Sequence, residues 1–273
     1  MKVTIHIGHE KTGTTSIQSY LARHYGRPGE SLYFPQTGRR AGIEQHRILY
    51  NELLAQRPAI IKQALQRELE QAGCEHAVLS CEMFSALDPK SNAALESLIA
   101  VGSALGWKIT VVCYVRKANP FLRSLYMEGL KWNWKLDFEG FVKVHLPRLL
   151  DGSLKRVIEM RGAKAVFLPY QREGMVPSFL ETIAPGTGFV AEREMQLNQR
   201  IPEWMGPFIL MANRTFNNQD YTHQAIVTAM QLKTSPPDWF DADAFFFLSD
   251  EIKQAIATIE ATDPVRKALF SEA

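Results

Sequence analysis

The chain has few cysteines and no long hydrophobic run. Its three cysteines, Cys74, Cys81 and Cys113, have no C-x-x-C spacing and no zinc-like arrangement with histidine. A disulfide framework or a structural zinc site is therefore not predicted, and we expect a reduced, cytoplasmic chain. No apolar run approaches the roughly 18 residues of a membrane span. The first residues lack the basic and apolar regions of a signal peptide, so we expect neither export nor a membrane span.

The chain also lacks an excess of charge of either sign. Lys and Arg together number 31 against 29 Asp and Glu, which gives a net charge of +2 among 273 residues. This balance argues against a protein that binds nucleic acid non-specifically, although it allows a local basic pocket. Internal repeats and low-complexity tracts are missing too, and a hydrophobic content of 46% is ordinary for a globular protein with a sizeable core.

Strand and helix patterns alternate along most of the chain. Short β-branched runs predict strands at 2–7, 31–34, 76–80, 108–115 and 163–168. Helical spacing predicts helices at about 16–25, 44–56, 58–73, 91–105, 119–132, 138–149 and 151–161. Asn119 and Pro120 are the expected N-cap and first residue of their helix. Beyond residue 175 the pattern is mostly helical, with an expected loop from 184 to 207.

This alternation predicts an α/β fold with three layers and a central parallel sheet of about five strands. We expect one domain over 1–273, with a core of about 1–175 and a helical extension of about 176–273. Ligands of such sheets bind at the carboxyl ends of the strands. Three polar clusters follow predicted strands: a loop from Gly8 to Ser16, then Glu82, then Arg116. We expect them to meet at one edge of the sheet.

The loop after the first strand has the features of an anion site. A glycine, a lysine, several hydroxyls and the start of a helix come together there, which places backbone N–H groups around one point. Gly8 and Gly13 have the separation of a nucleotide triphosphate P-loop, but that motif needs a lysine directly after its second glycine. Here Thr14 follows Gly13, and the lysine is the earlier Lys11. This departure argues against a kinase or an ATPase.

The same loop has a closer likeness. It reads Lys11, Thr12, Gly13, Thr14, Thr15 and Ser16. This run after a first strand resembles the 5′-phosphosulfate loop of sulfotransferases that use 3′-phosphoadenosine 5′-phosphosulfate (PAPS). Those enzymes also carry an arginine at the end of a later strand and a serine eight residues on, both binding the 3′-phosphate. Arg116 and Ser124 have that spacing.

A third likeness concerns the end of the predicted strand at 76–80. The run Ser80-Cys81-Glu82-Met83-Phe84 is similar to the acidic motif of heparan-type sulfotransferases, in which the glutamate is the proposed base. The resemblance implies a P-loop-like fold and transfer of a sulfuryl group from PAPS to a hydroxyl or amine, without a metal. It also implies that Lys11 stabilises the leaving nucleotide. The acceptor it implies is a small molecule or a glycan, such as a carbohydrate or glycolipid.

The base remains open at this stage. Glu82 is one candidate, and His46, which follows a Gly- and Arg-rich loop, is the other. Residues that could contact the acceptor are His9, Glu10, Arg39, Arg40, Trp132 and Trp134, each with a plainer interpretation as solvent-exposed or packing residues.

Two other functions fit the sequence. One is another phosphoryl-transfer enzyme of the P-loop kind, against which the missing Gly-Lys-Ser/Thr argues. The other is a non-catalytic protein of the same fold that binds an adenosine nucleotide. Dependence on magnesium separates the first from a sulfotransferase, and the effect of substituting Glu82 and His46 separates the second.

Overall fold

The structure is a computed structural model. It describes residues 1–8, 11–40, 42, 44–85, 89–150, 153–171, 173–188, 201–216, 236–238 and 240–270. These residues form two compact units. The first comprises 1–116, 151–197 and 263–273, and the second comprises 117–150 and 198–262. The units therefore alternate along the chain, whereas the expected core and extension followed one another. Whether the chain folds as the single domain that we expect stays a prediction.

The first unit is built on a parallel sheet of five strands, as predicted. The strands are β1 (Lys2–His6), β2 (Leu32–Tyr33), β3 (His76–Ser80), β4 (Lys108–Val115) and β5 (Ala163–Pro169). Their order across the sheet is β2-β3-β1-β4-β5. The chain thus leaves β1 towards one edge, returns to β3, and then crosses to the other side of β1. Such a reversal of strand order is where open α/β sheets bind ligands.

The register brings the carboxyl ends of the three central strands together. His6 on β1 lies beside Ser80 on β3 and beside Val112 on β4. Backbone bonds continue past this level, from Ile7 N–H to the Val112 carbonyl at 2.9 Å and from Cys81 N–H to the His6 carbonyl at 3.1 Å. The loop, Glu82 and Arg116 all follow directly after these strands.

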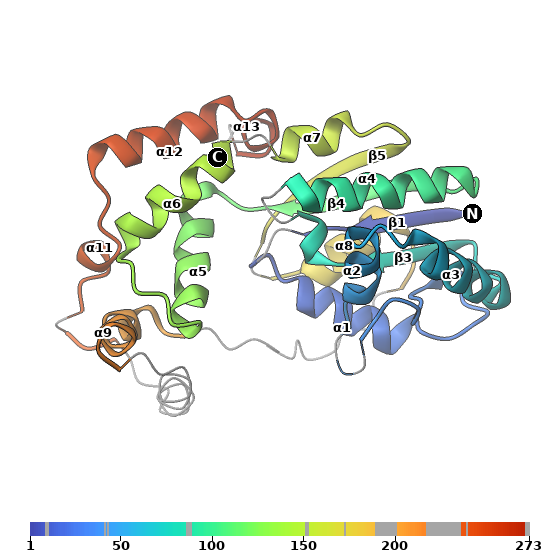
Figure 1. The fold of residues 1–273 in the computed structure, drawn as a ribbon, viewed down its shortest axis with the longest axis horizontal. Helices are drawn as coiled ribbons and strands as arrows, with labels where there is room; N and C mark the ends of the chain where they lie inside the picture. Colours follow the sequence, from blue (N-terminus) through green and yellow to red (C-terminus); the bar gives the residue numbers. More distant parts are fainter. Residues whose placement is uncertain are drawn as a thin grey trace. The chain divides into compact units, whose positions relative to one another are not determined.

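Helices cover both faces of the sheet and make three layers (Figure 1). One face packs against α2 (Arg47–Leu54), α3 (Pro58–Ala72), α4 (Pro89–Ala104), α7 (Ser153–Glu159) and α13 (Pro264–Phe270). The opposite face packs against α1 (Thr14–His24) and α8 (Met175–Ile183). In the view of Figure 1, α4 and α7 lie above the strands and α1 lies below them.

Strand β1 is buried on both faces, which explains its pattern. Side chains alternate along a strand, so Val3 and Ile5 enter the core under α2 and α4, while Thr4 and His6 face the α1 side. All four side chains are buried. A parallel strand covered on both sides normally reads as a continuous apolar run. The two buried polar residues of β1, Thr4 and His6, are therefore an exception and need hydrogen-bond partners.

The second unit is helical. It consists of α5 (Ala118–Lys131), α6 (Phe138–Leu150), the 3₁₀ turn η2 (Glu203–Met205), α9 (Gly206–Phe216), α11 (Ala242–Phe245) and α12 (Asp250–Thr262) among the residues that the structure describes. Its core is an aromatic cluster around the fully buried Tyr126. The rings within 6.4 Å of it are Phe138, Phe141, Phe245 and Phe246.

Two predictions of element boundaries are wrong. The expected N-cap and first-residue roles of Asn119 and Pro120 fail because α5 begins at Ala118. The carboxylate of Glu260 on α12 accepts the Ala118 N–H, so the helix gains its cap from a residue far away in the sequence. The expected loop from 184 to 207 contains η2 and the first residues of α9. Among the described residues, no helix has both the length and the apolar character needed to cross a membrane.

Candidate anion-binding site

The loop between β1 and α1 bends through two left-handed residues. Lys11 has φ 65° and Gly13 has φ 74°. Gly13 is the N-cap of α1, and its carbonyl accepts the Ser16 N–H at 3.0 Å. A left-handed conformation is natural for glycine but uncommon for lysine, and such residues concentrate at ligand clamps. His9 and Glu10, which we considered as acceptor contacts, lie outside the described residues.

The loop packs closely against the start of α1. A Cβ atom on Gly8 would lie only 2.4 Å from Cγ2 of Thr14, so the backbone approach there needs glycine. The hydroxyl of Ser85 lies 2.7 Å from the Gly8 carbonyl oxygen and 2.8 Å from the Glu82 carbonyl oxygen. Ser85 thus ties the end of the glycine turn to η1 (Glu82–Ser85), the short 3₁₀ helix that follows β3.

Glu82 reaches the loop directly. The Thr14 hydroxyl donates a hydrogen bond of 2.8 Å to Oε2 of Glu82. Thr14 is buried and is the first residue of α1, whereas Glu82 is half-buried at the first position of η1. α1 has no acidic residue in its own first turn. The carboxylate of Glu82 therefore stands beside the positive end of the helix dipole.

Arg116 also reaches the loop. Its Nη1 donates to the carbonyl of Lys11 at 3.4 Å, and its guanidinium carbon lies 5.0 Å from the centre of the Tyr170 ring. Tyr170 follows β5, and its N–H donates to the Val115 carbonyl at 2.7 Å. The structure thus brings three sequence-predicted residues to one loop: Lys11 by its backbone, Glu82 through Thr14, and Arg116 by its side chain.

The other hydroxyl residues of the loop differ in exposure. Thr12 is fully buried. Thr15 and Ser16 are half-buried on the first turn of α1. The resemblance to a 5′-phosphosulfate loop implies that Thr12 to Ser16 bind the phosphosulfate group, and these contacts stay predictions.

Ser124 lies on α5, which belongs to the second unit. Its role with Arg116 in binding a 3′-phosphate therefore stays a prediction from spacing. The first turn of α5 already has an anionic partner, because the Glu260 carboxylate accepts the Ala118 N–H.

His46 is held in the core. It is fully buried, its Nδ1 accepts the Ser80 N–H at 3.1 Å, and its Nε2 lies 3.1 Å from the Pro35 carbonyl oxygen. Burial, with a smaller effect of the Arg39 charge, lowers the pKa of His46 to about 4. Both ring nitrogens are engaged by backbone groups, so this environment favours a structural role for His46 and leaves Glu82 as the better candidate base.

Of the remaining acceptor candidates, Arg39 and Trp134 have packing or ion-pair partners, and Arg40 and Trp132 are exposed. Arg39 pairs with Glu44 at 2.6 Å, and its guanidinium carbon lies 4.8 Å from the Phe34 ring centre. Arg40 is exposed. Trp134, in the second unit, stacks on Phe141 and His145, and Trp132 is 64% exposed.

A buried polar chain beneath the loop was not predicted. Gln18 Nε2 on α1 donates to the Ser80 hydroxyl at 3.0 Å, and this hydroxyl lies 2.9 Å from Nδ1 of His6. All three residues are buried. The signal in the sequence is His6, a polar residue at the end of a buried strand, two residues before Gly8.

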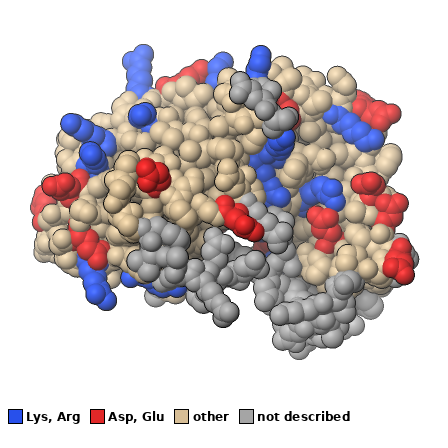
Figure 2. Space-filling view, turned by 180° about the vertical axis from the view of Figure 1, so that it is seen from behind, with Lys and Arg blue, Asp and Glu red and all other residues tan. Residues whose placement is uncertain are grey.

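The face of the molecule drawn in Figure 2 carries charges of both signs. Figure 2 shows Lys and Arg side chains interspersed with Asp and Glu side chains over the face drawn, and neither sign covers it. The described residues contain no group of three or more His, Cys, Asp or Glu side chains arranged to hold a metal ion.

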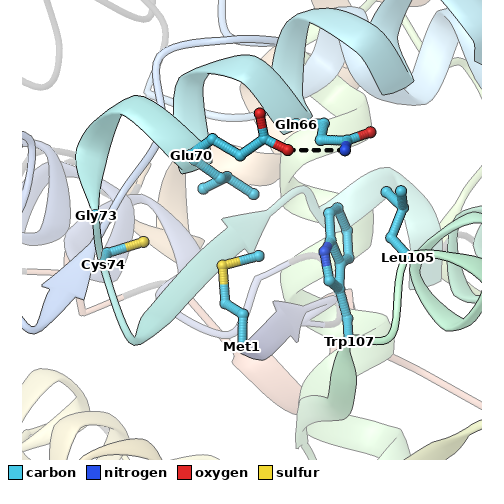
Figure 3. Close-up of a pocket in the computed structure, with 8 residues that line it drawn as sticks. Met1, Gln66, Glu70, Gly73, Cys74, Leu105 and Trp107 are labelled. Atoms are coloured by element: carbon cyan, nitrogen blue, oxygen red, sulfur yellow. Dashed lines mark hydrogen bonds between the residues drawn. The ribbon is translucent and has the colours of Figure 1, made fainter.

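A pocket of about 420 Å³ lies at the amino ends of the strands, away from the loop (Figure 3). Met1 precedes β1, Cys74 precedes β3 and Trp107 precedes β4, so their side chains line this pocket at the amino ends of the strands. Figure 3 shows Glu70 and Gln66 of α3 joined by a hydrogen bond of 2.8 Å on one side of it. The candidate residues for chemistry lie at the carboxyl ends instead.

Comparisons with family models, with curated proteins and with solved structures found no match to this chain.

Proposed function

We propose that this chain is a sulfotransferase that transfers a sulfuryl group from PAPS to a hydroxyl or amine of an acceptor, with a carbohydrate or glycolipid as the favoured class. The observation that carries the proposal is the meeting of the Lys11–Thr14 loop, Glu82 and Arg116 at the ends of the adjacent strands β3, β1 and β4. The resemblance of the loop to a 5′-phosphosulfate loop supplies the chemistry.

The loop suits the phosphosulfate group. The N-terminus of α1 and the backbone of a left-handed turn at Gly13 favour a negatively charged oxygen. Arg116 adds a planar fork that suits the other anionic end of PAPS, its 3′-phosphate. No lysine follows Gly13, so the position from which a P-loop lysine contacts a triphosphate is taken by Thr14.

The proposed reaction is a direct displacement at sulfur. The oxygen or nitrogen of the acceptor forms a bond to sulfur while the bond between sulfur and the bridging phosphate oxygen breaks. Lys11 stabilises the negative charge that develops on this leaving oxygen. Glu82 takes the proton that the acceptor loses. 3′-Phosphoadenosine 5′-phosphate (PAP) is the other product.

The hydrogen bond between Thr14 and Glu82 has a consequence for this scheme. The Thr14 hydroxyl cannot donate its one proton to Glu82 and to a phosphate oxygen at the same time. Two negative charges about 4 Å apart also repel by about 4 kcal/mol at an effective dielectric constant of about 20. Binding of the nucleotide should therefore release Glu82 from Thr14, and the carboxylate then becomes available to the acceptor.

Calorimetry with PAP tests the proposal. We expect the wild-type chain to bind PAP, and Lys11→Ala and Arg116→Ala to bind it at least about tenfold more weakly, because each loses a charge-assisted contact. Lys2→Ala and Lys108→Ala are matched controls. These exposed lysines lie at the amino ends of β1 and β4, the two strands that Lys11 and Arg116 follow. They should bind PAP as the wild type does.

The outcomes separate the candidate functions. No binding of PAP by the wild type overturns the proposal, and unchanged binding by both site variants overturns the site. Transfer of labelled sulfate from PAPS should persist in a chelator of divalent cations. Transfer of phosphate from ATP that stops with the chelator would identify the phosphoryl-transfer alternative, and binding of PAP without any transfer would identify the non-catalytic one.

A further inference from the structure

His6 lies directly beneath the anion loop. It ends β1, on the face of the sheet that α1 and α8 cover, and its side chain is fully buried. The ring centre of Phe179 lies 5.0 Å away and that of Tyr114 lies 6.2 Å away. Burying the ring nitrogens of a histidine in such apolar surroundings costs free energy unless they have hydrogen-bond partners.

The hydrogen bonds of Ser80 favour one assignment of the proton on the His6 ring. The Ser80 hydroxyl oxygen accepts a hydrogen bond from Gln18 Nε2, so Gln18 cannot also accept the hydroxyl proton at that atom. The described acceptor for that proton is Nδ1 of His6, at 2.9 Å. Burial lowers the pKa of His6 to about 3, so the ring is neutral near pH 7. Its one proton is then on Nε2.

The Nε2 proton has no acceptor among the described residues. The atom lies close to Gly8, where the loop begins. A Cβ placed on Gly8 would lie 3.0 Å from Nε2 of His6 and 3.3 Å from Oγ1 of Thr12. Nε2 and the buried Thr12 hydroxyl thus border the same small space, and a buried donor without an acceptor is costly to maintain.

We propose that His6 is a positioning residue of the anion loop, and that its Nε2–H donates a hydrogen bond to the Thr12 hydroxyl oxygen when the loop holds the phosphosulfate group. A hydroxyl oxygen can accept this bond while its own proton is donated elsewhere. The bond gives the ligand-bound loop a contact that the structure does not show, and so favours binding. The role assigned to His6 rests on the proposed function, since the phosphosulfate is taken as the ligand of the loop.

Nuclear magnetic resonance of the wild-type chain tests this without any change to the site. The chain has seven histidines, and labelling their side chains with ¹⁵N makes each ring visible. The signals of His6 are those lost in His6→Gln. We expect the Nε2–H signal of His6 to be present without ligand and to move downfield on saturation with PAP. A signal that stays in place at saturation overturns the proposal.

Affinity measurements use two variants of opposite character. His6→Gln keeps an N–H donor near the position of Nε2, and His6→Leu removes it. We expect His6→Leu to bind PAP about tenfold more weakly, equivalent to about 1.4 kcal/mol, and His6→Gln to stay within about threefold of the wild type. His76→Leu makes the same change at the first residue of β3, whereas Ser80, the partner of His6, is the last residue of that strand. This control should leave the affinity for PAP unchanged.

Equal affinities of the wild type and His6→Leu for PAP overturn the proposal. If His6→Leu does not fold, the Nε2–H signal of His6 and the affinity of His6→Gln decide the question. A signal that moves on saturation with PAP, together with a PAP affinity of His6→Gln close to that of the wild type, supports the role. A His6→Gln variant that binds PAP much more weakly than the wild type overturns it.

Inorganic pyrophosphate as a second probe separates this proposal from the proposed function. Binding of pyrophosphate that depends on His6, without binding of PAP, would overturn the sulfotransferase function and support the role of His6. Binding of PAP that does not depend on His6 would do the reverse. Failure of the wild type to bind either probe overturns both.

Discussion

On the scale of single residues, the contact between Thr14 and Glu82 is the central feature of the candidate site. The sequence placed the threonine in an anion loop and the glutamate at the end of another strand, 68 positions away. It did not indicate that one donates to the other. In the structure the Glu82 carboxylate accepts a hydrogen bond from the Thr14 hydroxyl. Under the proposed function, the same carboxylate would oppose binding of the nucleotide and serve as the base for the transfer.

We predict opposite effects of Glu82→Gln on binding and on turnover. Removing the charge should tighten binding of PAP by about tenfold, a part of the repulsion expected between two nearby anions. Removing the base should lower kcat by about 10²-fold or more. Calorimetry and a transfer assay measure the two effects. Glu96→Gln, an exposed change on α4, should alter neither. Unchanged binding of PAP by Glu82→Gln would show that the carboxylate does not compete with the nucleotide.

On the scale of elements, the loop after β1 and helix α1 are joined directly at Gly13. Gly13 ends the loop in the left-handed region and begins the helix, so the direction of the helix N-terminus depends on its φ of 74°. There is room for a methyl group, because a Cβ on Gly13 would lie 3.6 Å from the nearest atom, Cγ of Met175. The constraint on this residue is therefore its backbone conformation.

Gly13→Ala should cost about 1–2 kcal/mol of unfolding free energy, the price of a left-handed residue with a Cβ. Gly29→Ala is the matched control: its φ is 88°, and nothing lies within 4 Å of the added carbon. Urea denaturation should give both variants similar losses of stability, while calorimetry with PAP should show weaker binding for Gly13→Ala alone. Equal affinity of the two variants would mean that the loop tolerates a change of conformation at Gly13.

Helix α5 shows where prediction of elements fails. Asn119 and Pro120 have the residue types of a helix start, yet α5 begins before them, at Ala118. The N–H of Ala118 is satisfied by Glu260, 142 positions away in the sequence. A cap supplied by tertiary packing leaves no signal in the local sequence. The strands were predicted better, because a buried strand is recognisable from its own β-branched run.

On the scale of the whole molecule, buried histidines make stability depend on pH. Burial lowers the pKa of His6 to about 3 and those of His46 and His76 to about 4, with smaller contributions from Arg39 at His46 and Lys2 at His76. In the unfolded chain each titrates near 6.5. Above that pH both states are neutral at these sites and the full stability is present. As the pH falls below it, the unfolded chain binds protons that the folded chain refuses.

We therefore predict that stability falls as the pH is lowered from about 6.5 to about 4, by up to about 1.4 kcal/mol per pH unit for each of the fully buried His6 and His46. The partly exposed His76 should contribute less, because solvent screens its charge. Glu68 acts at lower pH. Burial alone would raise its pKa, but hydrogen bonds from Tyr33, Thr37 and Gln36 outweigh this effect and lower the pKa. The contribution of Glu68 to stability is therefore lost only as the pH falls through that lowered value.

Urea denaturation between pH 7 and pH 4 measures the slope of the unfolding free energy against pH. His46→Gln should flatten it, and a wild-type profile without slope would contradict the neutral buried state of these rings.

The sequence by itself determined the α/β class, the strands of the parallel sheet and the three polar clusters at its carboxyl edge. These features depend on local signals, namely runs of β-branched residues, glycines and hydroxyls next to predicted strand ends. Only the tertiary structure decided how the clusters connect: Thr14 to Glu82, Arg116 to the Lys11 carbonyl, His46 to the backbone of Ser80, and His6 to the underside of the loop. Such contacts join residues far apart in the chain, and their geometry depends on the order and register of the strands, which no local pattern records.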